Sequence, residues 1–260
     1  MSSIALGTAY CVGVVGATLG GGVSANQGYA GLLVDLLQSV QLVTADGRVI
    51  TSSRTENADL FWGLTGAGAN FGVVTSATYR VPPVVNGGRV TNANYLFTRN
   101  QSAAFFSYLA SLDNDMPAHM ALNIASVYDA ASDQVVLLVN VNFAGTPRSA
   151  APYLAPLKAL NPLRAEVLEV PWPKVFSTSY FGIEDTKACG RNQHVNMRSV
   201  GAARTDPEAL TAFVGELERF NREHPDVIMA MVLHRFSNEA VLKVSDEETA
   251  YPHRNIKMHM

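Results

Sequence analysis

Cysteine and concentrated charge are both scarce in this sequence. Its only cysteines are Cys11 and Cys189, and neither belongs to a CxxC motif or a Cys/His cluster. This pattern excludes a zinc knuckle and the dense disulfide framework of small secreted proteins. Lysine and arginine total 19 against 22 aspartate and glutamate, for a net charge of −3, and no basic run occurs. A surface that follows nucleic-acid phosphates is therefore not expected, and a small molecule is the expected partner.

No charged side chain occurs before Asp35. A membrane span over residues 4–23 would explain this, but repeated glycines, including a run of three at 20–22, each weaken a helix by about 1 kcal/mol. Val23-Ser24-Ala25 resembles a signal-peptide cleavage site, yet no basic residue precedes it. The third interpretation is a glycine-rich loop whose backbone can approach a ligand closely. We expect the uncharged N-terminal segment to form this glycine-rich loop, and we expect neither a membrane span nor a signal peptide in it.

Composition indicates a globular protein, because the 260 residues are 48% hydrophobic and only 16% charged. One large domain or two small ones would fit this length. Residues 36–44 and 48–53 are rich in β-forming residues and flank Ala45-Asp46-Gly47. Because Asp-Gly readily takes the positive φ of a tight turn, these two runs predict a β-hairpin.

A short helix should follow the hairpin. Residues 58–64 should be helical, with Asn57 as the N-cap and Gly66 near the helix end. Phe61 and Trp62 fit packing within this helix better than stacking on a ligand.

A strand is predicted next, over residues 71–81, and Pro82-Pro83 should end it. Its alternating pattern predicts one shared face for Val73, Thr75, Ala77 and Tyr79.

Longer amphipathic elements fill the second half of the chain, after Asn86-Gly87-Gly88. The sequence predicts helices at 101–112 and, broken near Pro152 and Pro156, at 147–160, and strands at 119–128, 134–143, 163–170, 227–236 and 240–244. The clearest helix begins after Asp206 as cap, with Pro207 in its first turn, and should present one apolar face, consisting of Leu210, Phe213, Val214, Leu217 and Phe220. Helices on one face of an antiparallel sheet account for these elements.

Two glycine-rich segments stand on either side of the hairpin, VGVVGATLGGG at 12–22 and GAGANFG at 66–72. Each could direct backbone N–H groups at a diphosphate or a flat ring. Neither contains GxGxxG between a strand and a helix, and neither contains the GK[ST] of a P-loop. Folds that bind NAD(P) or ATP are therefore disfavoured.

These segments carry a family resemblance. VGVVGATLGGG, LLVDLLQSVQLVTADGRVITSS and ENADLFWGLTGAGANFGVVTSATYRV resemble the FAD-binding domain of berberine-bridge-enzyme-like oxidases, which is of the PCMH type. The resemblance is dense over residues 12–83 and weaker at Val170-Pro171-Trp172 and at Tyr251-Pro252-His253-Arg254. It implies an α+β fold in which residues 1–88 form the C-terminal half of a PCMH-type FAD-binding domain. Residues 89–260 would then form an incomplete substrate domain, an antiparallel sheet with helices on one face.

The same resemblance implies FAD as cofactor, with the first glycine segment along its pyrophosphate and ring and the second near the adenine half. The expected cofactor-binding residues are Val12, Gly13, Gly16, Gly20, Gly21, Gly22, Gly72, Val73 and Val74. The catalytic residues cannot be assigned from this pattern, and we expect no metal.

The sequence departs from the family at both ends. It has nothing like the upstream loop whose histidine often bonds the flavin, and Ala9 stands where many relatives have a flavin-linked cysteine. We therefore expect no covalent flavin bond and interpret Cys11 as a small buried side chain. Because the chain resembles about half of a complete enzyme, we expect an oligomer or a second chain to cover its exposed strands.

Other polar residues are weaker candidates for chemistry. His194 fits a surface position, and Tyr180 could line a pocket or pack in a loop. Glu184 and Asp185 are adjacent in sequence and, in an extended segment, would point in opposite directions. His253 and Arg254 are interpreted mainly as fixing the start of a strand.

The resemblance implies hydride transfer from an alcohol, a sugar or an activated carbon to FAD, with oxygen reoxidising the flavin. We therefore expect an FAD-linked oxidoreductase that acts on a small organic substrate in secondary metabolism. Two alternatives remain open: a catalytically silent remnant that acts as a binding module, and a non-redox cyclase on the same scaffold.

Overall fold

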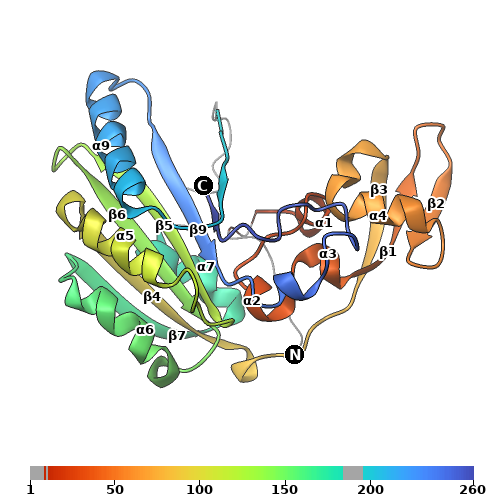
Figure 1. Cartoon of the computed structure of the whole chain (residues 1–260), viewed down its shortest axis with the longest axis horizontal. Helices are drawn as coiled ribbons and strands as arrows, with labels where there is room; N and C mark the ends of the chain where they lie inside the picture. The colour runs from red at the N-terminus through yellow and green to blue at the C-terminus, as the bar shows by residue number, and fades with distance from the viewer. Residues whose placement is uncertain (1–8, 10, 184–195) are drawn as a thin grey trace.

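The computed structural model describes residue 9 and residues 11–183 and 196–260. It contains a three-stranded sheet, in the order β2-β1-β3, and a seven-stranded sheet, in the order β7-β4-β6-β5-β9-β10-β8. We call these the small sheet and the large sheet, and Figure 1 shows them at opposite ends of the molecule. All neighbouring strands are antiparallel, which confirms the predicted α+β fold.

The first glycine-rich segment is not the continuous loop that we expected. It contains the helix α1 (Val14–Leu19), with Gly13 as N-cap and Gly20 as C-cap. Gly13 and Gly20 stand at the ends of this helix, where backbone freedom is useful, whereas Gly16 lies within it. Two further short helices, α2 (Gln27–Ala30) and α3 (Leu33–Leu36), lead into the small sheet.

The predicted hairpin is confirmed as β1 (Leu37–Val43) and β2 (Val49–Ser53), with Gly47 at φ 83° in the turn. The third strand, β3 (Val73–Tyr79), pairs with β1 through an irregular register. Gln41 pairs with Ser76 and Leu42 with Val74, so Thr75 forms a bulge. A bulge reverses the alternation of faces. The prediction that Val73 faces the same way as Ala77 is therefore wrong: Val73 is 69% exposed, and Val74 packs inward instead.

The helix after the hairpin, α4 (Ala58–Ala67), begins where predicted and runs further, with non-helical dihedrals at Thr65 and Gly66. Asn57 is the N-cap residue, but its side chain donates to the carbonyl of Thr51 rather than capping the helix. Its left-handed backbone, at φ 48°, directs the side-chain amide back toward Thr51 of β2. Phe61 is buried as predicted, whereas Trp62 is half-exposed and donates to the Glu247 carbonyl.

The large sheet contains all but one of the strands predicted for the second half of the chain. Its strands are β4 (Arg89–Thr98), β5 (Met120–Asp129), β6 (Gln134–Phe143), β7 (Arg164–Pro171), β8 (Gly201–Ala202), β9 (Ala230–Phe236) and β10 (Met258–His259). The exception is residues 240–244, where a short 3-10 helix covers Val241–Lys243 instead of a strand.

Helices α5 (Ser102–Ser111), α6 (Pro147–Ala159) and α9 (Pro207–Glu223) cover one side of the large sheet (Figure 1). Helix α6 is continuous, not broken as predicted. Pro152 and Pro156 lie on its exposed side, where water can bond the carbonyls that the prolines leave free, and Leu154 and Leu157 anchor its buried side. The much shorter α7 (Val175–Thr178) lies on the other side of the sheet, against β4.

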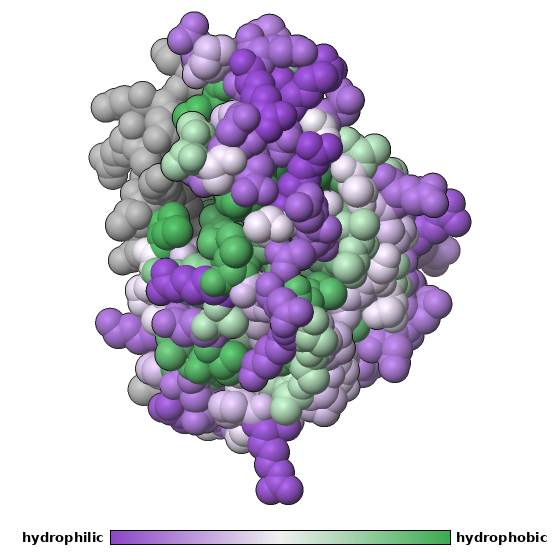
Figure 2. Space-filling view, turned by 90° about the vertical axis from the view of Figure 1, so that its left-hand side faces the viewer, coloured by the Kyte–Doolittle hydropathy of each residue, from purple (hydrophilic) through white to green (hydrophobic). Residues whose placement is uncertain are grey.

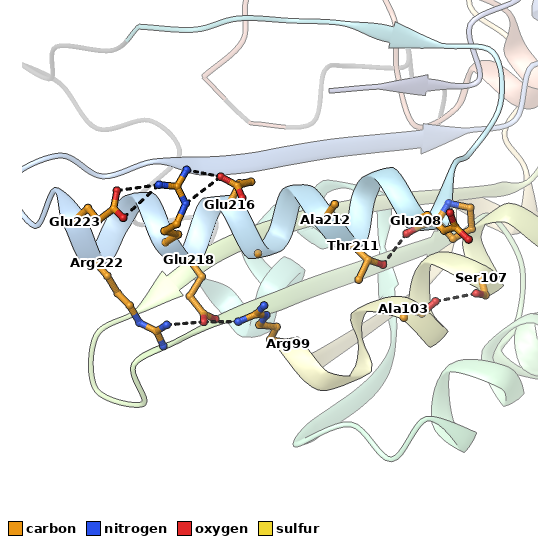
Figure 3. Close-up of a pocket in the computed structure, with 13 residues that line it drawn as sticks. Arg99, Ala103, Ser107, Glu208, Thr211, Ala212, Glu216, Glu218, Arg222 and Glu223 are labelled. Carbon is orange, nitrogen blue, oxygen red and sulfur yellow. Dashed lines mark hydrogen bonds and ion pairs between the residues drawn. The ribbon is translucent and has the colours of Figure 1, made fainter.

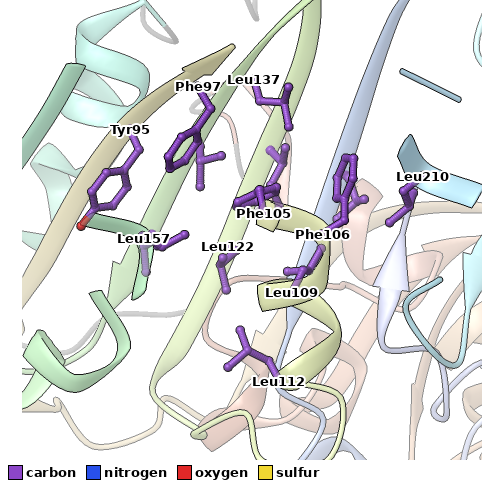
Figure 4. Packing of buried hydrophobic residues seen from close by; sticks show 14 of the residues in the cluster. Tyr95, Phe97, Phe105, Phe106, Leu109, Leu112, Leu122, Leu137, Leu157 and Leu210 are labelled. Atoms are coloured by element: carbon purple, nitrogen blue, oxygen red, sulfur yellow. The ribbon is translucent and has the colours of Figure 1, made fainter. Parts of the chain in front are cut away.

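The principal core lies between the large sheet and these helices. Figure 4 shows Phe105 of α5 packing among Phe97, Leu122 and Leu137 from the sheet.

Helix α9 is capped by the Asp206 side chain, as predicted, and buries Leu210, Val214 and Leu217. Phe213 is 38% exposed, because the helical repeat places it on the flank of that stripe. Figure 2 shows the outer side of this helix layer, where hydrophilic side chains interleave with smaller hydrophobic patches.

Candidate functional site

Three of the glycines predicted to contact a ligand border open space. Among the residues that the structure describes, a Cβ added at Gly13 or Gly16 would meet nothing within 4 Å, and one at Gly20 would meet only the Ala17 carbonyl oxygen at 3.8 Å. Val12 beside them is 43% exposed. The backbone of α1 is therefore accessible from one side along most of its length.

The next two glycines serve the packing of the chain itself. A Cβ on Gly21 would lie 2.4 Å from the Tyr251 ring, and one on Gly22 would lie 2.2 Å from Cβ of Leu33. Both positions have positive φ and are buried. The lack of a side chain at these two glycines therefore lets Tyr251 and Leu33 pack against the backbone.

Gly72, Val73 and Val74 lie further along the chain, at the start of β3. A Cβ on Gly72 would lie 2.3 Å from the Val43 carbonyl oxygen, so this glycine allows β3 to approach β1. Val73 points outward, and Val74 packs against the small hydrophobic cluster. Their assignment to the cofactor stays a prediction.

The two glycine-rich segments do come together. Leu19 of α1 packs on Gly68, where an added Cβ would lie 2.5 Å from the leucine Cδ2. The Tyr79 hydroxyl donates to Oγ1 of Thr18 at 2.9 Å. The structure thus joins α1 to the end of α4 and to β3 at one place.

Residues 249–254 connect this region to the large sheet. The backbone at Tyr251 covers Gly66, and its ring covers Gly21. Arg254 is 2% exposed and donates to both carboxylate oxygens of Asp35, at 2.7 and 3.1 Å. Arg254 thus holds this segment against α3, whereas we had interpreted it as fixing a strand start; β10 begins only at Met258.

Sequence reasoning missed a line of polar side chains on the side of the large sheet opposite α5, α6 and α9, which we call the open face. Paired residues of antiparallel strands point to the same side, and the register aligns these side chains straight across five strands and onto a sixth. We call this line the polar row; in order from β7 to β10, it consists of Glu166, Asn94, Asn140, Asn123, His234 and His259. The sequence signal was the unusual repetition of asparagine at alternate positions, Asn92 and Asn94 in one strand and Asn140 and Asn142 in another.

The asparagine end of the row holds a strained turn. Asn94 donates to the Thr178 carbonyl at 2.8 Å and accepts from the Tyr180 amide at 2.8 Å. Asn140 in turn donates to Oδ1 of Asn94 at 2.8 Å. Tyr180 and Phe181 both have left-handed backbones, at φ 51° and 60°, a conformation that a non-glycine residue keeps only when its surroundings impose it. Tyr180 is buried where its backbone bonds to Asn94, so it packs on the open face of the large sheet.

The histidine end of the row is electrically neutral near pH 7. Nδ1 of His234 lies 2.9 Å from Oδ1 of Asn123, and its ring stacks on Phe236 with 5.6 Å between centroids. Burial, followed by the charge of His259, lowers the pKa of His234 to about 4. Burial also lowers the pKa of His259. This end of the row therefore offers hydrogen bonds without charge.

Several predicted candidates fall elsewhere. Cys189, Glu184, Asp185 and His194 lie outside the described residues. Cys11 is exposed and disulfide-bonded, so our interpretation of it as a small buried side chain is wrong.

A cavity of about 1090 Å³ lies between α5 and α9 on the helical side of the large sheet. Figure 3 shows that most of its charged side chains pair with one another, among them Glu218 with Arg99 and Arg222. Glu218 bonds Arg99 at 2.6 Å and Arg222 at 3.0 Å, and also accepts from the Val135 amide. These ion pairs stabilise the packing of α9 on the sheet. The cavity lies on the helical side of the large sheet, away from the glycine-rich segments (Figure 1).

Within the described ranges, no group of histidine, cysteine, aspartate and glutamate could hold a metal ion. In the same part of the chain, no helix has the length and apolar character needed to cross a bilayer. The remaining candidates are thus the accessible side of α1 and the open face.

Comparisons with known proteins show relatives among the FAD-linked oxidoreductases. No protein-family model matches the chain. The FAD-linked oxidoreductase azaG of Aspergillus niger is 42% identical over 255 residues, which cover 97% of this chain and 54% of the relative. The chain spans about half the length of the curated relatives that it matches.

Solved structures show the same fold. A glucooligosaccharide oxidase of Acremonium strictum superposes with a TM-score of 0.73 and 25% identity, over 99% of this chain and 54% of the other. BBE-like 1 of Physcomitrella patens gives a TM-score of 0.78 at 22% identity, over 99% of this chain and 56% of the other.

Proposed function

We propose that this chain, a homologue of the FAD-linked oxidoreductases over nearly its whole length, forms part of the flavin site and the substrate-facing sheet of such an enzyme. The observation that carries the proposal is the accessible backbone at Gly13, Gly16 and Gly20, which no side chain of the described residues covers. A flat cofactor needs such a surface in order to approach main-chain amides closely.

The residues present fit FAD in part. The amides of Gly13 and Gly16 come at or before the first turn of α1, where backbone N–H groups have no intrahelical acceptor. In contrast, Val12, Gly20 and Gly21 already donate to the carbonyls of Ala9, Ala17 and Thr18. We therefore assign the hydrogen bonds to FAD to the amides of Gly13 and Gly16. Gly20 would only leave space for the cofactor, because its amide already has an acceptor.

FAD would supply the acceptor for a hydride, which no side chain can supply. The chain's own contribution is to place a small organic substrate. Figure 1 shows that the open face of the large sheet is turned toward the part of the molecule that contains α1, with residues 249–259 running between them. A substrate held by the polar row would thus lie on the same side as the glycine-rich segment.

The small sheet also leaves apolar side chains exposed, with Val49 at 67% and Val73 at 69%. We propose that a second chain or a further copy covers this surface. Light scattering after size-exclusion chromatography tests the further copy, with a mass above 27.9 kDa expected and a monomer contradicting self-association.

The alternative function is that of a remnant without flavin. It is favoured by one observation: Tyr251 and Leu33, rather than a ligand, occupy the space beside Gly21 and Gly22. Purified protein separates the two functions. We expect flavin absorbance bands that persist after desalting, a rise in melting temperature with added FAD, and a colourless pellet on acid precipitation because the flavin is not covalently held. A colourless protein whose melting temperature ignores FAD would support the remnant.

A further inference from the structure

We propose that Asn100 is the attachment site of an N-linked oligosaccharide, which the chain acquires in an oxidising, secretory compartment. This modification site is separate from the flavin and from the substrate. Three observations point to it: a sequence motif, the position of Asn100 in the fold, and the disulfide at Cys11.

The motif is Asn100-Gln101-Ser102, which has the pattern Asn-X-Ser with a residue other than proline in the middle. Asparagine accepts an N-linked oligosaccharide in this pattern, where serine or threonine stands two positions later. None of the other asparagines in the sequence is followed by serine or threonine at that spacing. The sequence therefore offers Asn100 as its one acceptor.

The fold places Asn100 where it can carry a bulky group. The residue lies in the 3-10 turn η3 (Arg99–Gln101), between β4 and α5, and it is exposed. Its side-chain amide has no partner among the described residues. The asparagines of the polar row differ, because Asn94 and Asn140 are buried and their amides donate to other residues. Modification of Asn100 would therefore cost no hydrogen bond within the described part of the fold.

The two other residues of the motif belong to the packed structure around this turn. The Gln101 side chain accepts from the Thr98 amide at 2.8 Å and donates to the carbonyl of Asn161 at 2.8 Å. Ser102 is 2% exposed at the start of α5, so its hydroxyl is out of reach once the helix has packed on the sheet. We therefore place the transfer of the oligosaccharide on the growing chain, before α5 packs.

An oligosaccharide at Asn100 would leave the candidate functional site uncovered. Strand β4 begins at Arg89, beside the link from the small sheet, and Asn100 follows the far end of this strand. At about 3.3 Å per residue, the polar row at Asn94 is roughly 15–20 Å away. Figure 1 shows α5, which begins at this turn, at the end of the molecule opposite the small sheet. The oligosaccharide would instead shield Leu163, which is 64% exposed after α6.

The disulfide at Cys11 points to the same compartment. Disulfides form and persist in oxidising environments such as the lumen of the endoplasmic reticulum, and they are rare in the cytosol. N-linked oligosaccharides are surface modifications of secreted proteins. Two chemically unrelated features of this chain thus require one environment. We assign no targeting signal within residues 1–260.

The first test is mass spectrometry of the full chain, secreted from yeast behind a cleavable leader. We expect a glycopeptide that contains Asn100, and N-glycosidase F should release the sugar and convert this asparagine to aspartate. Asn100→Gln should be secreted without the sugar. Asn114→Gln is the matched control, because Asn114 is also exposed but lies outside the motif, and it should keep the sugar.

A second pair of variants tests the motif while Asn100 itself stays in place. Ser102→Ala removes the hydroxyl group and should abolish the modification, whereas Ser102→Thr restores a hydroxyl group and should retain it. A sugar that persists in Ser102→Ala would show that the motif is not what directs the modification, and would overturn the assignment.

The compartment is tested on protein purified from the organism that makes this chain. We expect the same glycopeptide there, and we expect Cys11 to resist alkylation until a reductant is added. An unmodified Asn100 in either preparation would overturn the proposal. A Cys11 thiol that alkylates without reductant would contradict the oxidising compartment.

Discussion

The two sheets of this molecule achieve stability in different ways. The large sheet shares an extensive core with three helices, in which Phe97, Phe105 and Phe106 are fully buried. The small sheet has a core of only Leu37, Val40, Leu42, Phe61 and Leu64. The nearby glycine-rich segment depends instead on residues 249–254, which arrive from the other end of the chain. Part of the candidate cofactor site is thus held in place from outside the small sheet.

This difference assigns separate roles to the two regions. Under the proposed function, the region of the small sheet would contribute the backbone that Gly13 and Gly16 leave accessible. The large sheet would contribute side chains that a rigid framework aligns across strands. The following changes test the comparison, in order of decreasing expected effect.

Arg254→Ala should have the largest effect. It leaves the Asp35 carboxylate, whose side chain is 7% exposed, without its partner, which typically costs about 3–5 kcal/mol. Urea denaturation would measure this loss, and limited proteolysis should show cleavage near α1 before cleavage within the large sheet. Arg48→Ala is the matched control, because Arg48 pairs with Asp46 at the surface and its loss should cost less than about 1 kcal/mol. Equal effects of the two substitutions would show that residues 249–254 are not what holds the glycine-rich segment.

His234 should make stability depend on pH on the large-sheet side. Its pKa is about 4 in the folded protein and 6.5 in a model compound, so the unfolded chain binds a proton between these values and the folded protein does not. This stability is fully present above pH 6.5 and is lost as pH falls toward 4, by about 3 kcal/mol at most. His234→Gln should flatten the unfolding free energy across this window, and His224→Gln should not. An unchanged pH profile in His234→Gln would contradict the burial assigned to this imidazole.

The glycines of the first segment should separate into two classes. Gly21→Ala places a Cβ 2.4 Å from the Tyr251 ring at a positive φ and should cost about 1–3 kcal/mol. Gly16→Ala lies within α1 beside open space and should stabilise the protein by about 0.5–1 kcal/mol. Thermal unfolding of both variants measures the contrast. If both substitutions destabilise the protein alike, the distinction between packing glycines and accessible glycines fails.

Local sequence signals predicted much of the fold. The Asp46-Gly47 turn and the Asp206 cap depend on neighbouring residues, and both were confirmed. The bulge at Thr75 was missed because it depends on pairing with Gln41 and Leu42 rather than on the sequence of β3 itself.

The candidate site was less predictable because distant residues form it. Asp35 and Arg254 are 219 positions apart, and His234 meets Asn123 across 111 positions. A single sequence shows that these residues are present, but only strand order and register show that they are neighbours. The glycines were identified from sequence, but their division into accessible and packed positions required knowing what lies over each.

The most direct test of the central claim is the affinity for FAD of the unaltered chain and of Gly16→Val, measured by quenching of flavin fluorescence. A Cβ at this position meets no atom of the described residues within 4 Å, so we expect the fold to be retained while the added side chain blocks approach to the backbone. We predict saturable binding by the unaltered chain and affinity about tenfold weaker in the variant, a difference of about 1.4 kcal/mol. Equal affinity in both proteins, or no binding in either, would contradict the assignment of the accessible side of α1 to the cofactor.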